Sequence, residues 1–171
     1  MKSKFLAFIA LVAATLSLSS CLSSDETVVE YTNDTAITSF SLGKLGRYTK
    51  TTAGKDTLIA DKVNGANYKF YIDQVTRQIY NVDSLPTKTR TAAVLATISS
   101  KNSSPIFIMH KDYPEKIDSA KYYSSTDSID FSQPRQVRVY NNSLNAYVTY
   151  TVKVNVHQQE GDEFNWQTKA Q

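Results

Sequence analysis

The chain has 171 residues, a net charge of +3 and one cysteine. This length is enough for one domain with its own hydrophobic core, and a single cysteine excludes an intramolecular disulfide scaffold. The basic residues are scattered and form neither a patch nor an arginine-rich helix, so we expect no nucleic-acid partner.

Residues 1–20 have the three-part pattern of a secretory signal peptide. Lys2 and Lys4 are basic, residues 5–16 are apolar, and Ser19 and Ser20 are small. The apolar run is shorter than the roughly 20 residues that a membrane-spanning helix needs. We therefore expect cleavage after residue 20.

The only cysteine follows this segment directly. Residues 18–21, Leu-Ser-Ser-Cys, resemble a bacterial lipobox, which implies that the thiol of Cys21 is acylated and that this residue becomes the new N-terminus. Each buried CH2 adds about 0.8 kcal/mol to membrane binding, so several acyl chains on one residue give a stable anchor. The membrane is thus an expected partner through Cys21, and a free thiol is the alternative.

Residues 21–33 are polar and acidic and lack apolar periodicity, which predicts a flexible tether after the lipidated cysteine. Ser24, Asp25 and Glu26 resemble the acidic signal that directs lipoproteins of Bacteroidota to the outer face of the outer membrane. A plain spacer is the alternative. The expected localisation is the outer membrane, with lipid anchoring and possible surface exposure.

From residue 34 onward the sequence is rich in Thr, Val, Ile and Tyr, which favours β-structure. Short alternating or apolar runs bounded by turn residues predict strands at residues 36–42, 68–72, 78–82, 94–98, 105–109, 136–140 and 146–156. Residues 68–72 and 78–82 form a predicted hairpin. Residues 43–65 have the weakest pattern and suggest a long loop or an edge hairpin.

The last two segments predict a second, antiparallel hairpin. In residues 146–156, Val148, Tyr150 and Val152 share one face with two further valines, while polar residues and Tyr147 take the other. Residues 141–145 are turn formers. The predicted fold class is all-β: a single antiparallel immunoglobulin-like β-sandwich at residues 34–158, followed by a tail or linker at residues 159–171.

Several segments recur in one order in a known family, namely residues 37–42, 71–73, 79–86, 98–103 and 128–134. In these segments the chain resembles an uncharacterised N-terminal domain of Bacteroides-type outer-membrane lipoproteins. The resemblance implies an immunoglobulin-like sandwich and no catalytic residue. Family members often continue into a kelch-like β-propeller, which the 171 residues here do not include, so we expect either a short stand-alone member or a truncated product. Trp166 in the tail either caps the sandwich or packs against a following domain.

Five aspartates precede Ser or Thr and then a small or aliphatic residue. This form resembles the O-glycosylation acceptor of exported Bacteroides proteins, and it implies candidate acceptors at Thr35, Thr57, Ser84, Ser119 and Ser128. The alternative is structural, because Asp-Ser and Asp-Thr pairs favour turns by bonding their own backbone.

The sequence contains no recognisable catalytic motif. His110 and His157 have no partner at ligand spacing, and there is no phosphate loop, nucleophile elbow or His-Glu-x-x-His motif. Asp127 and Asp130 have the ligand chemistry for calcium, but their spacing matches no recognised loop. We therefore expect no enzyme activity, no cofactor and no metal site.

Three tyrosines lie in the polar stretch before the last hairpin: Tyr113, Tyr122 and Tyr123. Exposed tyrosines can stack on sugars, so these residues are candidate glycan contacts. The favoured alternative is that Tyr122 and Tyr123 straddle a strand, with one ring inward and the other outward.

Three classes of function remain. We favour a non-catalytic, membrane-anchored lipoprotein that acts as a cell-envelope spacer or binding module, with a cell-surface glycan or protein as its possible partner. The second class is a carbohydrate-capture accessory protein of a polysaccharide uptake system. The third is a fimbrial subunit, which needs a removable first strand and a cleaved arginine, and Arg47 is the nearest candidate.

Overall fold

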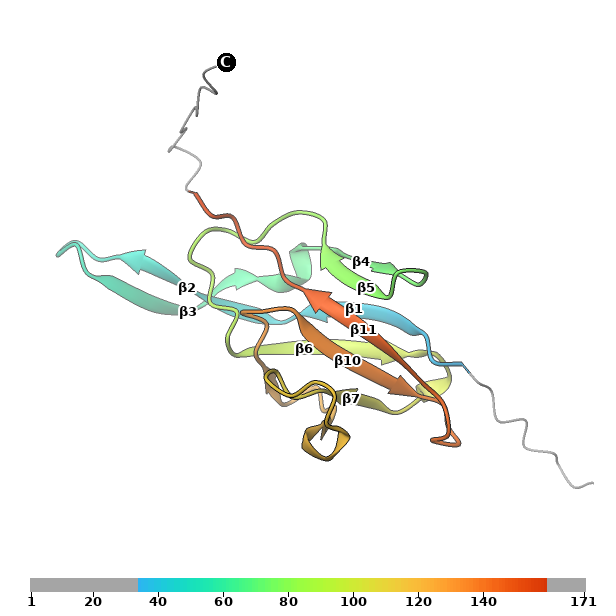
Figure 1. Cartoon of the computed structure of the whole chain (residues 1–171). Coiled ribbons are helices and arrows are strands. Elements are labelled where there is room, and N and C mark those ends of the chain that lie inside the picture. The colour runs from blue at the N-terminus through green and yellow to red at the C-terminus, as the bar shows by residue number, and fades with distance from the viewer. Residues whose placement is uncertain (1–33, 160–171) are drawn as a thin grey trace, which may run out of the picture. The chain divides into compact units, whose positions relative to one another are not determined.

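The structure, a computed structural model, describes residues 34–159. The predictions for residues 1–33, including Cys21, and for Trp166 lie outside the described residues. The described residues form eleven strands and three short 3-10 turns (Figure 1). The strands are β1 (Ile37–Leu42), β2 (Lys44–Lys50), β3 (Asp56–Asn64), β4 (Phe70–Asp73), β5 (Gln78–Asn81), β6 (Val94–Ser100), β7 (Ile106–Ile108), β8 (Lys121–Tyr122), β9 (Ser128–Ile129), β10 (Arg135–Tyr140) and β11 (Tyr147–Lys153). The turns are η2 (Gly65–Asn67), η3 (Lys101–Ser103) and η4 (Ile117–Ser119).

Two sheets enclose the core. The larger has the strand order β4-β5-β11-β10-β7-β8, and the smaller has the order β1-β6-β9. Strands β10 and β11 pair antiparallel, with Val137 opposite Tyr150, so the predicted last hairpin is confirmed. The predicted hairpin of β4 and β5 is confirmed as well. The all-β sandwich is therefore the observed fold class.

One strand pair differs from the predicted antiparallel arrangement. Strand β11 pairs parallel with β5, with Val152 opposite Ile79. The alternation in β11 predicts which side chains point inward, but it carries no information on the direction of the neighbouring strand. Five strands lie between β5 and β11 in the sequence, so their pairing is a long-range contact that depends on the whole fold.

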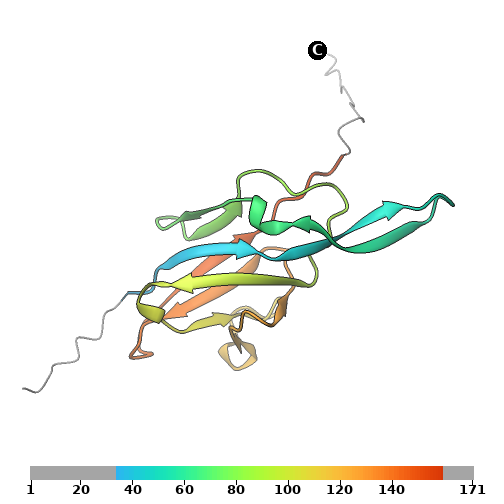
Figure 2. The ribbon, with the colours of Figure 1, turned by 180° about the vertical axis from the view of Figure 1, so that it is seen from behind.

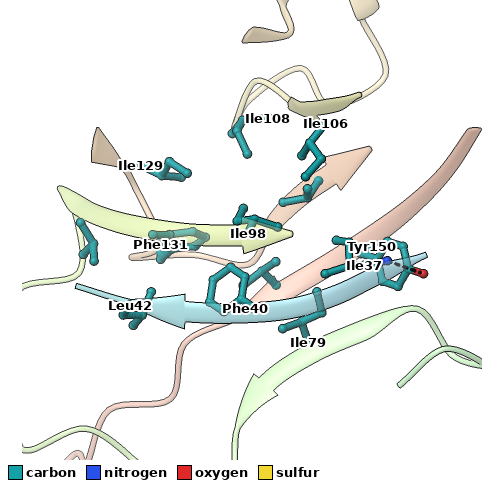
Figure 3. Packing of buried hydrophobic residues seen from close by; sticks show 14 of the residues in the cluster. Ile37, Phe40, Leu42, Ile79, Ile98, Ile106, Ile108, Ile129, Phe131 and Tyr150 are labelled. Atoms are coloured by element: carbon teal, nitrogen blue, oxygen red, sulfur yellow. Dashed lines mark hydrogen bonds between the residues drawn. The ribbon is translucent and has the colours of Figure 1, made fainter. Parts of the chain in front are cut away.

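The core lies between the two sheets and is built from their inward-facing side chains. Phe40 of β1 contacts Phe70 and Phe131, with ring centroids 4.6 and 5.8 Å apart. Figure 3 shows Phe40, Phe131 and Ile98 in this cluster. At the other end of β1, the backbone N–H of Ile37 points at the hydroxyl of Tyr150 at 3.4 Å.

Strands β2 and β3 form a hairpin that extends beyond the two sheets (Figures 1 and 2). Residues 50–57 at its tip are all exposed. Of the two possibilities for residues 43–65, the structure selects a hairpin. It was hard to predict because, apart from Leu45 and Val63 at its base, most of its residues are exposed or half-buried and no alternation marks a buried side.

The base of this hairpin packs closely against the body. Gly65 is buried, and its N–H donates to the carbonyl of Gly43 at 3.0 Å. A Cβ atom on Gly65 would lie 2.6 Å from the Cβ atom of Leu42 and closer still to the carbonyl of Gly43. Only glycine permits this approach of two backbones.

Candidate functional site

A partly open cavity of about 260 Å³ lies where β8, β9 and the start of β10 meet. Ile108, Met109 and Ile129 form its apolar wall. Its polar wall consists of His110, Ser119, Lys121, Ser124, Asp127, Ser128 and Arg135, and Tyr122 and Tyr123 complete the lining. We refer to this cavity as the edge pocket, because β8 is an edge strand of the larger sheet and β9 of the smaller.

Arg135 is the residue of the edge pocket that the sequence predictions missed. It is the first residue of β10 and has the same strand parity as the buried Val137 and Val139. Alternation therefore turns its side chain toward the space between the sheets. The sequence feature that could have indicated Arg135 is a charged residue at an inward-facing strand position. It was not recognised because Arg135 follows Pro134 at the very start of the strand.

The guanidinium of Arg135 has incomplete hydrogen bonding. Among the described residues, its Nε and Nη1 atoms are shielded from solvent and have no hydrogen-bond partner. Burial lowers the pKa of Arg135, while the charges of Asp130 and Asp112 oppose that effect. No carboxylate of the described residues lies within ion-pair distance of it. The edge pocket thus holds a partly desolvated cation without a contact counterion.

Asp130 acts on Arg135 through its charge without forming an ion pair with it, and its carboxylate is hydrogen-bonded to Ser132. Its Oδ1 accepts hydrogen bonds from the backbone N–H of Ser132 at 2.9 Å and from the Ser132 hydroxyl at 2.6 Å. Burial opposes ionisation of Asp130, but these bonds and the charges of Lys111 and Arg135 outweigh it and lower the pKa of Asp130. The carboxylate is held ionised at the turn before β10.

Tyr122 and Tyr123 point to opposite sides of the chain. Tyr122 is 62% exposed, and its ring meets that of Phe107 edge to face at 5.4 Å. Tyr123 packs against the core, and its hydroxyl donates to the carbonyl of Ala96 at 2.8 Å. The favoured interpretation of this pair, one ring inward and one outward, is confirmed.

Tyr113 lies beside the edge pocket without lining it. Its ring stacks on His110, with centroids 5.4 Å apart and an interplanar angle of 22°. The ammonium of Lys116 lies 4.9 Å from the centre of the same ring. Tyr113 therefore holds a wall residue of the pocket in place and remains 56% exposed itself.

An ion pair spans one side of the edge pocket. The ammonium of Lys121 in β8 lies 2.9 Å from a carboxylate oxygen of Asp127, which precedes β9. Both side chains are substantially exposed, so the pair adds little stability. Its effect at the pocket is that these two opposite charges largely cancel.

The five candidate acceptor hydroxyls fall into two groups. Ser119 and Ser128 line the edge pocket, and both are exposed. Thr57 is exposed on β3 of the projecting hairpin, whereas Thr35 and Ser84 are half-buried elsewhere. Whether any of them carries a sugar stays a prediction.

A row of aromatic rings crosses the outer face of the larger sheet, next to the edge pocket. Starting from Tyr122, the row continues through Phe107, Tyr140 and Tyr147, with successive ring centroids 5.2 to 5.4 Å apart. The guanidinium of Arg138 lies 4.3 Å from the centre of the Tyr147 ring. The row joins β8, β7, β10 and β11, and no single segment of the sequence reveals it.

The remaining candidate residues, Arg47 and His157, do not line the edge pocket. The guanidinium of Arg47 donates to the carbonyl of Thr87 at 2.8 Å from within paired strand β2, and His157 is exposed beyond β11. Within residues 34–159, no group of three His, Cys, Asp or Glu side chains is arranged to hold a metal ion. None of these residues forms a helix long and apolar enough to cross a membrane.

The fold and the edge pocket define an all-β sandwich domain with a small, partly open cavity at one sheet edge. Residues 40–154 match the family described as the Domain of unknown function (DUF6242) N-terminal domain, and the chain belongs to that family. No curated protein and no solved structure matches the chain.

Proposed function

We propose that the protein is a non-catalytic lipoprotein of the cell envelope, anchored through Cys21, whose sandwich domain serves as a binding module. The signal-peptide pattern and the lipobox-like residues 18–21 support the anchor. The resemblance to Bacteroides-type lipoproteins supports the outer membrane as its location. The edge pocket supports binding in preference to a pure spacer.

The observation that carries the binding role is the state of Arg135. A buried donor without a partner costs about 1–3 kcal/mol, and native proteins keep few such groups. Local departures of this kind concentrate at functional sites, where a ligand or a conformational change uses them. In Arg135 this departure coincides with a cavity that has apolar, aromatic and hydroxyl-bearing walls.

A carbohydrate-capture role is the second candidate. It is favoured by the exposed aromatic row, which begins with Tyr122 at the edge pocket and offers apolar ring surface with hydroxyl groups. A sugar chain bound in the edge pocket would also contact the aromatic row, because Tyr122 belongs to both. The fimbrial alternative gains no comparable support, since Arg47 lies in a paired strand.

Two measurements test the proposal. The mass of the protein extracted from its own membranes should equal that of a chain starting at Cys21 plus acyl groups, and Cys21→Ser should release the protein from the membrane. For binding, the full chain is screened in detergent against a panel of soluble polysaccharides. Tyr122→Ala should weaken the strongest interaction, whereas Tyr71→Ala, an equally exposed ring on β4, should leave it unchanged.

A mature chain without acyl groups would contradict the anchor. Binding that is equally strong in both tyrosine variants would place the contact away from the edge pocket.

A further inference from the structure

We infer that the edge pocket selects an acidic sugar, a hexuronic acid, and that Arg135 is the residue that attracts its carboxylate. This inference rests on the proposed function, because it takes the pocket to be a binding site and names the class of ligand. Three observations support it: the charge of Arg135, the size of the cavity and the residue types of its walls.

Arg135 is the charged residue of the pocket wall that lacks a contact partner among the described residues. The two other charged wall residues, Lys121 and Asp127, form an ion pair at 2.9 Å and largely cancel. Arg135 has no contact counterion among the described residues, and Asp130 is bound to Ser132. A carboxylate that enters this partly desolvated space interacts with the guanidinium more strongly than it would in water.

Nearby carboxylates weaken the attraction between Arg135 and a ligand carboxylate. Asp112 and Asp130 both act on the guanidinium, and Lys111 acts on Asp130. Neither carboxylate contacts the Arg135 guanidinium, so a ligand group that does so prevails at short range. Because Nε and Nη1 are shielded from solvent, direct hydrogen bonds form after a small side-chain movement, which is common on binding.

The size of the cavity and its walls favour a sugar ring. About 260 Å³ is just below the roughly 300–1,000 Å³ of pockets for drug-sized ligands, so the pocket accepts a small unit such as one sugar residue. Among the lining residues, Tyr122 carries an aromatic ring at the border between the pocket and the outer face, and Ser124 and Ser128 carry hydroxyls. An extended acidic peptide fits less well, because β8 has two residues and gives little edge for strand addition.

The test is a binding titration of the full chain in detergent. Galacturonate and glucuronate are compared with galactose and glucose, which carry a hydroxymethyl group in place of the carboxylate. Acetate and a short glutamate peptide serve as other carboxylate sources. We expect the uronates to bind at least about tenfold more tightly than the neutral sugars, the range of a charge-assisted hydrogen bond. The preference should weaken as salt rises.

Two substitutions locate the effect. Arg135→Gln should abolish the preference for uronates, while Arg135→Lys should retain part of it because the charge stays and the planar fork is lost. Arg90→Gln is the matched control, since it removes the same charge from an exposed position outside the edge pocket. In the unaltered protein, uronate should shift the methyl NMR signals of Met109 and Ile129, which needs no variant to fold.

The possible outcomes separate the two ideas. Equal binding of neutral and acidic sugars at these methyl groups would overturn the uronate inference and leave the binding module intact. Equal binding of acetate or the glutamate peptide would overturn the sugar part of the inference. Methyl signals unmoved by any probe would overturn both the inference and the edge pocket as the binding site.

Discussion

The hydroxyl of Tyr123 completes the hydrogen bonding of a strand edge. Its oxygen accepts the backbone N–H of Ile98 at 2.9 Å and donates to the carbonyl of Ala96 at 2.8 Å. Strand β6 pairs with β9 only at Val94 and Leu95, so this side of β6 has no strand partner further along. The Tyr123 hydroxyl thus makes the two backbone hydrogen bonds that a neighbouring strand would otherwise make at this point.

Tyr123→Phe should therefore lower the free energy of unfolding by about 1–3 kcal/mol, because two buried backbone groups lose their partner. Urea denaturation followed by far-UV circular dichroism measures this change. Tyr122→Phe is the matched control, since its ring is 62% exposed and its stability effect should be close to zero. Equal stability of the two variants would mean that water replaces the Tyr123 hydroxyl.

Tyr150 is the corresponding buried phenol of β11. Its hydroxyl donates to the side-chain carbonyl of Gln74 at 2.5 Å and accepts from the guanidinium of Arg77 at 3.0 Å. Tyr150→Phe should cost about 1–3 kcal/mol in thermal or chemical unfolding, since both partners lose a part-buried bond and the buried N–H of Ile37 loses its acceptor. Tyr147→Phe on the same strand, with a ring that is 53% exposed, should be neutral.

Gly65→Ala should destabilise the protein, because the added methyl group would collide with the backbone of Gly43 and the side chain of Leu42. We expect a cost at or above the about 1–3 kcal/mol typical of forced overpacking, together with loosening of the β2–β3 hairpin. Hydrogen exchange of the β2 amides measures the loosening. Gly54→Asn is the control, because Gly54 has a φ of +75° in an open turn and asparagine tolerates that region. Unchanged exchange in the Gly65→Ala protein would contradict the tight approach.

Asp73 should make the β4–β5 turn sensitive to acid. Hydrogen bonds from the side chain and backbone of Thr76 and from the backbone of Val75 lower the pKa of Asp73 below its ordinary value of 3.8. A carboxylate with a lowered folded-state pKa stabilises the fold above its ordinary pKa, and this contribution is lost as the pH falls through the lowered value. Amide exchange at Val75 and Thr76 should therefore speed up, beyond the intrinsic pH effect, only below about pH 4.

The Asp73→Asn protein keeps an acceptor oxygen but cannot titrate. Its exchange at the two amides, corrected for intrinsic rates, should be independent of pH over the same range. A transition that persists in this variant would assign the acid sensitivity to another group.

The strands that could be predicted are those with one buried face. Residues 146–156 alternate strictly, and alternation follows directly from a strand with a core side and a solvent side. The β2–β3 hairpin has no core side over most of its length, and β8 and β9 have two residues each, too few for a pattern. These elements depend on tertiary contacts that the local sequence does not encode.

The candidate site was predicted in part. Tyr122 and Tyr123 were predicted as glycan contacts and Ser119 and Ser128 as glycosylation acceptors. The fold brings all four to the lining of the edge pocket, and their predicted roles stay predictions. Arg135 was missed because its role depends on being inward-facing and without a counterion, which only the packed sandwich determines. The aromatic row was missed for a similar reason, since its four rings come from four strands.

The position of β11 has a consequence for how the protein folds. Strand β11, the last strand of the described residues, lies inside the larger sheet, and the hydrogen bonding of that sheet joins β4–β5 to β10–β7–β8 only through it. Residues 147–153 must therefore be in place before the larger sheet can close, and the parallel contact with β5 spans some seventy residues of chain. Such distant pairings raise the contact order and slow folding. The larger sheet consequently stays incomplete until β11 has joined its two parts.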